Sequence, residues 1–158
     1  MSENYFKEVT IKKIEVDSAG ELTELLQSEP PEYSAYFTPF DFNYDTIENI
    51  LLKKEKDIFF GLFIDNKIAG FYMLRGFDEG YEIPVYGVWI SSKFSGKGLG
   101  KLTLQHAVSF CKINGIKKIM LKVYPKNTAA KTLYENFGFK NIGTDPKNNN
   151  FIYMLNLE

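Results

Sequence analysis

Three glycines occur at every second position of the segment SGKGLG, which runs from Ser95 to Gly100. Glycine lets a ligand approach the backbone closely and tolerates a positive φ angle. The segment separates an apolar run from a helix-forming run, and backbone N–H groups at the start of a helix are free and carry partial positive charge. The pattern therefore predicts a site for a phosphate or pyrophosphate, with a tight turn that binds nothing as the alternative.

The spacing of these glycines excludes two common phosphate loops. A P-loop has four residues between its glycines, whereas Gly96 and Gly100 have three between them, and Leu102 replaces the hydroxyl residue that would contact magnesium. A dinucleotide fingerprint needs its third glycine one residue later and follows the first strand of its fold, not the fourth. The segment therefore belongs to neither class.

A tyrosine that could donate a proton follows further along the chain. Tyr134 lies seven residues after Asn127, which is two helical turns, so both side chains can share one helix face. A phenol is neutral at pH 7 and can act as a general acid. Asn127 is also a good helix N-cap. The alternative is a half-buried helix tyrosine without a chemical role.

These side chains require a framework, and the hydrophobic pattern predicts the order β-α-α-β-β-β-α-β-α-β-β. The run Pro84–Ile90 is apolar throughout, which is typical of a strand buried on both faces. It leads into the glycine segment and a helix, and such a crossover places the next strand parallel beside it. The sequence therefore predicts an α/β protein with a mixed sheet.

The expected strands are Val9–Val16, 58–65, 67–77, Pro84–Ile90, 117–124, 139–144 and 151–158. The expected helices are Ser18–Glu29, Thr46–Lys54 capped by Asp45, one from the glycine segment to Asn114, and Asn127–Phe137.

Composition limits the class of protein. A chain of 158 residues is expected to form a single domain, residues 1–158. The net charge of −1 gives no basic footprint for nucleic acid, and no apolar run is long enough for a membrane helix. The single cysteine fits a reducing compartment, and the polar segment Met1–Thr10 lacks the apolar stretch of a signal peptide. These features predict a cytoplasmic protein.

Two motifs resemble those of the GCN5-related N-acetyltransferase (GNAT) superfamily. That family carries [Q/R]-x-x-G-x-[G/A] between its fourth strand and third helix, and the segment SGKGLG matches it except that Ser95 replaces Gln or Arg. The downstream segment NTAAKTLYENFGF, Asn127–Phe139, is similar to the family pattern N-x-x-A-x-x-x-Y-x-x-x-G-F. The resemblance covers residues 58–139 and implies the GNAT fold, in which the two central parallel strands splay apart.

The resemblance also implies a cosubstrate, acetyl-CoA, with no metal. Its pantetheine arm would lie between the splayed strands and pair with backbone groups of Val88, Trp89 and Ile90, one of which would polarise the acetyl carbonyl. Asn127 would contact the arm or a bridging water, and Tyr134 would protonate the departing thiolate. Backbone groups of the glycine segment would hold the pyrophosphate. These residues are Ser95, Gly96, Lys97, Gly98, Leu99, Gly100 and Lys101.

The general base and the acceptor are open at this point. Glu82 is the first candidate base because it precedes the donor strand, with Asp78 and Glu79 beside it, although such a connector can be acidic only for solvation. Six aromatic residues between positions 33 and 44 predict either an apolar acceptor wall or a small satellite core. The expected acceptor-binding residues are Tyr36, Phe37 and Arg75.

The expected reaction is direct transfer of an acetyl group to a primary amine of a small molecule, with an amino sugar as one candidate. A protein N-terminus, a protein lysine, or a non-catalytic acetyl-CoA-binding module are the alternatives. The last strand, residues 151–158, could pair across a homodimer.

Overall fold

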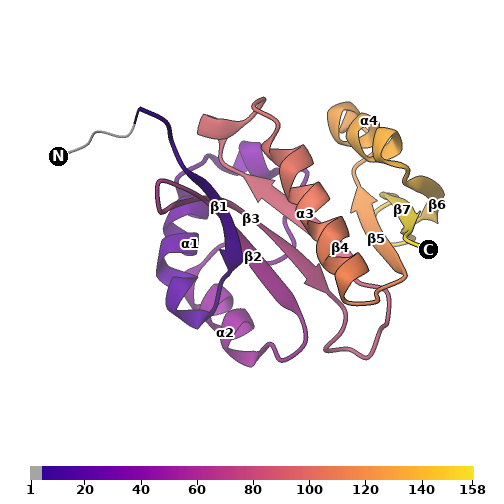
Figure 1. The fold of residues 1–158 in the computed structure, drawn as a ribbon, viewed down its shortest axis with the longest axis horizontal. Coiled ribbons are helices and arrows are strands. Elements are labelled where there is room, and N and C mark those ends of the chain that lie inside the picture. The colour runs from indigo at the N-terminus through magenta and orange to yellow at the C-terminus, as the bar shows by residue number, and fades with distance from the viewer. Residues whose placement is uncertain (1–4) are drawn as a thin grey trace.

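The computed structural model describes residues 5–158, which form one seven-stranded mixed sheet with helices on both faces (Figure 1). The first four residues of the polar N-terminal segment lie outside this range. The strand order is β1-β2-β3-β4-β5-β7-β6. The strands are β1 (Val9–Lys13), β2 (Ile58–Ile64), β3 (Lys67–Arg75), β4 (Val85–Ile90), β5 (Lys118–Val123), β6 (Lys140–Thr144) and β7 (Phe151–Asn156). The α-helices are α1 (Ala19–Gln27), α2 (Tyr44–Lys53), α3 (Leu99–Ile113) and α4 (Thr128–Phe137), and short 3-10 turns are η1 (Val16–Ser18), η2 (Pro31–Ser34) and η3 (Ser92–Phe94).

The predicted element order and fold class are confirmed, with small differences at element ends. The first strand ends at Lys13, earlier than expected. Helix α2 begins at Tyr44, and the side chain of Asn43, not of Asp45, caps it by accepting a hydrogen bond from Thr46 N at 2.9 Å. An asparagine directly before the helix can reach that N–H group, so the cap lies two residues earlier than the sequence suggested.

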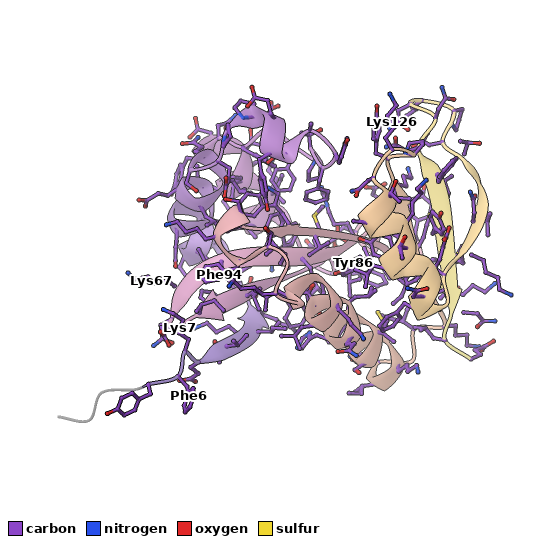
Figure 2. The ribbon with its side chains drawn as sticks, turned by 90° about the horizontal axis from the view of Figure 1, so that it is seen from above. Phe6, Lys7, Lys67, Tyr86, Phe94 and Lys126 are labelled. Carbon is purple, nitrogen blue, oxygen red and sulfur yellow. The ribbon has the colours of Figure 1, made fainter. Side chains whose placement is uncertain are left out.

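Each face of the sheet has its own hydrophobic core. Side chains alternate along a strand, so Phe71 and Met73 of β3 pack against α1 and α2, whereas Tyr72 and Leu74 pack against α3 and α4. Figure 2, turned to look from above, shows α1 and α3 on opposite sides of the strands. The sheet therefore separates an α1/α2 side from an α3/α4 side.

Strands β4 and β5 pair over a short length and then separate. Strand β4 pairs with β3 from Val85 to Ile90, but it pairs with β5 only through Val85↔Met120 and Tyr86↔Leu121. The expectation that the whole of Pro84–Ile90 is buried on both faces is wrong, because Val88 and Ile90 are only partly buried. The physical reason is that β5 diverges from β4 after the pair Tyr86↔Leu121, so the second half of β4 has no β5 neighbour. The region between the two diverging strands is called the splay below.

The last strand in the sequence is not the last strand in the sheet. Strand β7 lies between β5 and β6, and β6 forms the outer edge. Pairing between two copies at this edge would therefore use β6 and not β7. Within the described residues, none of the helices is both long and apolar enough to cross a membrane.

Candidate active site

The glycine segment forms an open loop at the start of α3. Gly96 and Gly98 have φ angles of 73° and 82°, which favour glycine, and a Cβ atom added at either would have no atom within 4 Å. Leu102 N bonds to Gly98 O at 3.0 Å, so the three N–H groups between them precede the first helical hydrogen bond. The loop therefore offers open space in front of free N–H groups, which suits a phosphate.

The side chains of the loop contribute less than its backbone. Ser95 Oγ donates a hydrogen bond to Ser92 O at 3.1 Å, so its hydroxyl closes the η3 turn. Lys97 and Lys101 are exposed at the surface. A Cβ added at Gly100 would lie 3.9 Å from Leu133 of α4, which is ordinary van der Waals contact, so the packing of the two helices does not require glycine at this position.

Backbone alternation decides which residues of β4 face the splay. Met120 N donates a hydrogen bond to Pro84 O at 2.9 Å, so the Pro84 carbonyl points toward β5. Strand geometry then turns the N–H and C=O groups of Val88 and Ile90 toward the same side. The N–H and C=O groups of Trp89 point toward β3 instead. In agreement, a Cβ atom added at Gly70 of β3 would lie only 2.6 Å from Trp89 O. Of the three expected residues, Val88 and Ile90 thus present backbone groups to the splay and Trp89 does not.

The segment around η2 attaches to the end of β4. The Tyr33 hydroxyl donates to Ile90 O at 2.5 Å, and Trp89 Nε1 donates to Ser34 Oγ at 2.9 Å. The rings of Tyr33 and Trp89 meet edge to face, with centroids 5.7 Å apart. Of the two residues whose backbone groups face the splay, Ile90 already has its carbonyl bonded to Tyr33. Val88 lies beyond the last β4–β5 pair.

Tyr134 lies inside the α3/α4 core with 8% of its surface exposed. It belongs to the same cluster as Tyr86, the last residue of β4 that pairs with β5. Burial raises the pKa of Tyr134 to about 12, so the phenol is neutral over the physiological range. Asn127 Oδ1 accepts a hydrogen bond from Ala130 N at 3.3 Å, which makes it the N-cap of α4. The structure thus places a neutral phenol near the point where the strands separate.

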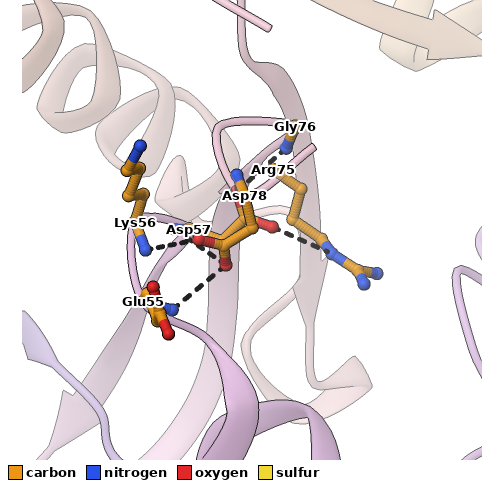
Figure 3. Close-up of polar contacts among 6 residues, drawn as sticks. All are labelled: Glu55, Lys56, Asp57, Arg75, Gly76 and Asp78. Carbon is orange, nitrogen blue, oxygen red and sulfur yellow. Dashed lines mark hydrogen bonds and ion pairs between the residues drawn. The ribbon is translucent and has the colours of Figure 1, made fainter. Parts of the chain in front are cut away.

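The expected base, Glu82, and its neighbours lie away from the point where β4 and β5 separate. Glu82 is exposed and lines a cleft of about 700 Å³ together with Lys117 and Lys118, where α3 is followed by β5. Asp78 accepts hydrogen bonds from the backbone N–H groups of Glu55, Lys56 and Asp57 (Figure 3). These bonds lower the pKa of Asp78, and the bond from Lys56 has the largest effect. Asp78 therefore holds two chain segments together, and the structure does not bring Glu82 next to the splay.

Glu82→Gln is therefore expected to reduce kcat/KM for the amine by much less than the roughly 10²-fold that marks a general base. With Glu82 apart from the splay, water is the expected route for the amine proton. Steady-state rates at pH 6 to 9 measure the effect. A large loss near neutral pH that recovers as the pH rises would instead assign the base role to Glu82.

Arg75 also has a partner within the protein. Its Nε lies 4.0 Å from Asp57 Oδ2, and its guanidinium lies 5.9 Å from the centre of the Phe40 ring (Figure 3 shows the ion pair). Asp57 Oδ1 in turn accepts hydrogen bonds from Gly76 N and Asp78 N. Arg75 therefore helps to fix the end of β3. Within residues 5–158, no cluster of three or more His, Cys, Asp or Glu side chains could hold a metal ion.

The aromatic segment before α2 divides into two groups. Phe37, Phe40 and Phe42 pack against the α1/α2 core, and the rings of Phe37 and Phe40 each lie 6.3 Å from that of Phe71. Tyr36 is 53% exposed and stacks on Tyr124, a residue that no sequence motif had singled out. Core packing therefore accounts for Phe37, Phe40 and Phe42, and the acceptor-wall expectation stays a prediction for Tyr36.

Phe37→Ala is expected to lower the free energy of unfolding by about 2 kcal/mol, less than a fully buried phenylalanine would lose. Its ring fills the space over Gly87, where an added Cβ would lie 2.9 Å from Phe37 Cε1. Urea denaturation measures the change, and Tyr36→Ala, which removes a half-exposed ring, is the matched control with a smaller loss. Equal losses in both variants would contradict this division.

The fold and site together define a mixed α/β protein with an open glycine loop next to a pair of parallel strands that separate. The chain belongs to the GNAT acetyltransferase family, because the model of the Acetyltransferase (GNAT) family matches residues 21–139.

Of three curated relatives of the chain, two are acetyltransferases by name and one is an N-acetylaspartate synthetase. It is 28% identical to the N-acetylaspartate synthetase of Xenopus tropicalis over 97 residues, 61% of this chain and 36% of that protein. It is 30% identical to the mycothiol acetyltransferase of Corynebacterium glutamicum over 86 residues, 54% of this chain and 29% of that protein. It is 28% identical to the [ribosomal protein bS18]-alanine N-acetyltransferase of Salmonella typhimurium over 75 residues, 48% of this chain and 49% of that protein. The matches span about a third to a half of the length of these relatives.

Solved structures share the fold over nearly the whole chain. The PaiA N-acetyltransferase of Thermoplasma acidophilum, solved in complex with coenzyme A, superposes with a TM-score of 0.76 at 20% identity, covering 94% of this chain and 99% of that one. The ribosomal-protein-S5-alanine acetyltransferase of Vibrio fischeri gives a TM-score of 0.80 at 15% identity, covering 98% and 96%. At these identities the likeness concerns the fold.

Proposed function

We propose that the protein is an acetyl-CoA-dependent N-acetyltransferase that moves an acetyl group directly to a primary amine of a small molecule. The observation that carries this proposal is the combination of three features in one region. An open loop of free N–H groups begins α3, the strand before it separates from its neighbour, and a neutral buried phenol lies beside the point of separation. Membership of the GNAT family supports the same activity.

Each group of this site has a defined task in the proposed reaction. The N–H groups from Gly96 to Lys101 hold the pyrophosphate, and the splay-facing backbone of Val88 pairs with the pantetheine arm and polarises the thioester carbonyl. Bound acetyl-CoA supplies the activated acetyl group. The neutral amine nitrogen forms a bond to the carbonyl carbon and loses one proton to water, while the C–S bond breaks. Tyr134 gives its proton to the departing sulfur and then regains a proton from water.

The names of two relatives favour a small acceptor, and Tyr134 favours catalysis. N-acetylaspartate synthetase and mycothiol acetyltransferase carry the names of small molecules, although the ribosomal relative leaves a protein amine as the alternative. Tyr134 argues against a module that binds acetyl-CoA without catalysis, because such a module would not need a proton donor.

Release of free thiol from acetyl-CoA in the presence of a panel of amines tests the proposal. The panel contains an amino sugar, simple alkyl and aryl amines, a polyamine, amino acids and a peptide with a free N-terminus. Release that depends on a small amine supports the proposal. Release only with the peptide would favour protein acetylation, and tight coenzyme A binding without any release would favour the non-catalytic module.

A further inference from the structure

Two tyrosines that are distant in the sequence meet across the splay. The rings of Tyr36 and Tyr124 are stacked, with centroids 4.8 Å apart and an angle of 19° between their planes. Tyr124 directly follows β5, and by that point β5 has left β4, since their last pair is Tyr86↔Leu121. The stack is therefore a contact between the two halves of the sheet at the open end of the splay.

Each tyrosine is fixed to a different side of the opening. Tyr36 is carried by a segment that attaches to β4, because Phe37 lies over Gly87 and Ser34 accepts the Trp89 hydrogen bond. The carbonyl of Tyr124 accepts a hydrogen bond from Asn127 N at 2.9 Å, which ties it to the start of α4. The pair thus connects the α1–α2 segment to the helix that carries Tyr134.

Apolar side chains lie on the same side of the sheet as this pair. In β5 the alternate residues Ile119 and Leu121 are buried in the α3/α4 core, so Met120 points to the opposite side. Its partner in β7 is Met154, and both methionines are half-buried and outside the two hydrophobic cores. Stacked aromatic rings and methionine thioethers form the kind of surface that takes an apolar body.

Two cations lie at this region, Lys122 on the same face of β5 between Met120 and Tyr124 and Arg75 at the end of β3, and each is already paired with a carboxylate. Lys122 Nζ lies 3.0 Å from Asp145 Oδ2, and Arg75 Nε lies 4.0 Å from Asp57 Oδ2. A negatively charged acceptor would have to compete with these two aspartates. The same aspartates are engaged by cations and by backbone N–H groups, so they are poorly placed to attract a polyamine.

We propose that Tyr36 and Tyr124, with Met120 and Met154, form the acceptor site, and that the acceptor is an amine borne by an uncharged ring or apolar chain. This inference rests on the proposed function and names the substrate class of that same site. An arylalkyl amine such as phenethylamine and an amino sugar both carry an uncharged ring close to the amine, which is the shared chemistry that the site would recognise. Tyr124 is a specificity-determining residue that acts on the acceptor, while acetyl-CoA contacts other residues.

Steady-state kinetics with four amines test the substrate class. Phenethylamine and glucosamine are each expected to give a higher kcat/KM than aspartate and spermidine. The ratio of kcat/KM for phenethylamine to that for glucosamine then separates an aromatic acceptor from a sugar acceptor. Preference for aspartate or spermidine would overturn the inference while leaving N-acetyltransfer intact. Absence of thiol release with every amine would instead overturn the proposed function itself.

Three variants and one control variant test the role of the tyrosine pair. Tyr124→Ala is expected to raise KM for the preferred ring amine about tenfold and to leave KM for acetyl-CoA unchanged, because it removes binding surface for the acceptor only. Tyr124→Phe keeps the ring and should restore most of the affinity, whereas Tyr81→Ala, at an exposed tyrosine in the cleft with Glu82, serves as the matched control. The double variant Tyr36→Ala/Tyr124→Ala should be little worse than Tyr124→Ala, since the rings act together.

The single tryptophan gives a second measurement that does not depend on turnover. Trp89 contacts Tyr33 and Ser34 of the segment that carries Tyr36, so its fluorescence reports on that segment. Phenethylamine should change this fluorescence saturably in the wild type and only at about tenfold higher concentration in Tyr124→Ala. An equal response in both proteins, or a kinetic effect confined to KM for acetyl-CoA, would contradict the acceptor role.

Discussion

Gly98→Val is expected to weaken the binding of coenzyme A about 100-fold or more while the protein stays folded. Gly98 has a φ angle of 82°, which a β-branched residue rarely adopts, so valine would turn the loop and its N–H groups away from a ligand. Its side chain would also occupy the open space in front of the loop. Loss of two hydrogen bonds to a charged group, at about 1.5 kcal/mol each, accounts for an effect of this size.

Calorimetric titration with coenzyme A measures this loss, and Gly80→Val is the matched control. Gly80 also has a positive φ, 91°, and an added Cβ there would have no atom within 4 Å, but it lies in the connector before β4. The control therefore introduces similar backbone strain away from the loop and should keep wild-type affinity. Unchanged affinity in a folded Gly98→Val protein would exclude the glycine loop as the phosphate site.

Tyr134→Phe is expected to lower kcat and kcat/KM together by about 10–10³-fold. The change removes one oxygen and keeps the ring, so the edge-to-face contact with Phe139 at 5.7 Å and the affinity for acetyl-CoA should hardly change. The loss is partial because a thiolate is a fairly good leaving group, with a pKa near 8.5 for a comparable cysteine thiol. Both constants fall because the proton moves only in the transition state.

The pH dependence of this effect follows from the burial of Tyr134. Because burial raises the pKa of the phenol to about 12, it keeps its proton throughout pH 7 to 10, and the ratio of wild-type to variant rates should stay constant over that range. Tyr153→Phe is the control for loss of a buried hydroxyl: Tyr153 donates to Glu135 Oε1 at 2.9 Å, and its removal should affect stability more than rate. Full activity in Tyr134→Phe would make Tyr134 structural.

Features that depend on local sequence could be predicted well. The positive φ angles of Gly96 and Gly98 and the cap at Asn127 each arise within one turn or one helix. The order of helices and strands along the chain followed from the pattern of apolar runs for the same reason. Such features need no knowledge of which segments meet in space.

Features that depend on pairing between distant segments could not be predicted. The orientation of Trp89 follows from where β5 joins β4, and the Tyr36–Tyr124 stack joins segments 88 residues apart. Arg75 looked free at the end of a strand, yet the chain places Asp57 beside it. Glu82 directly precedes the donor strand in sequence, but the connector carries it to the cleft near Lys117. Contacts of this kind are set by the tertiary fold.

The most direct test of the central proposal is a product analysis by mass spectrometry. Purified protein is incubated with acetyl-CoA and the best amine of the panel, and free coenzyme A and acetylated amine are both quantified for the wild type and Tyr134→Phe. We expect equal amounts of the two products from the wild type and a slower but still equal formation of both from Tyr134→Phe. Coenzyme A released without acetylated amine, or bound acetyl-CoA left intact with every amine, would contradict it.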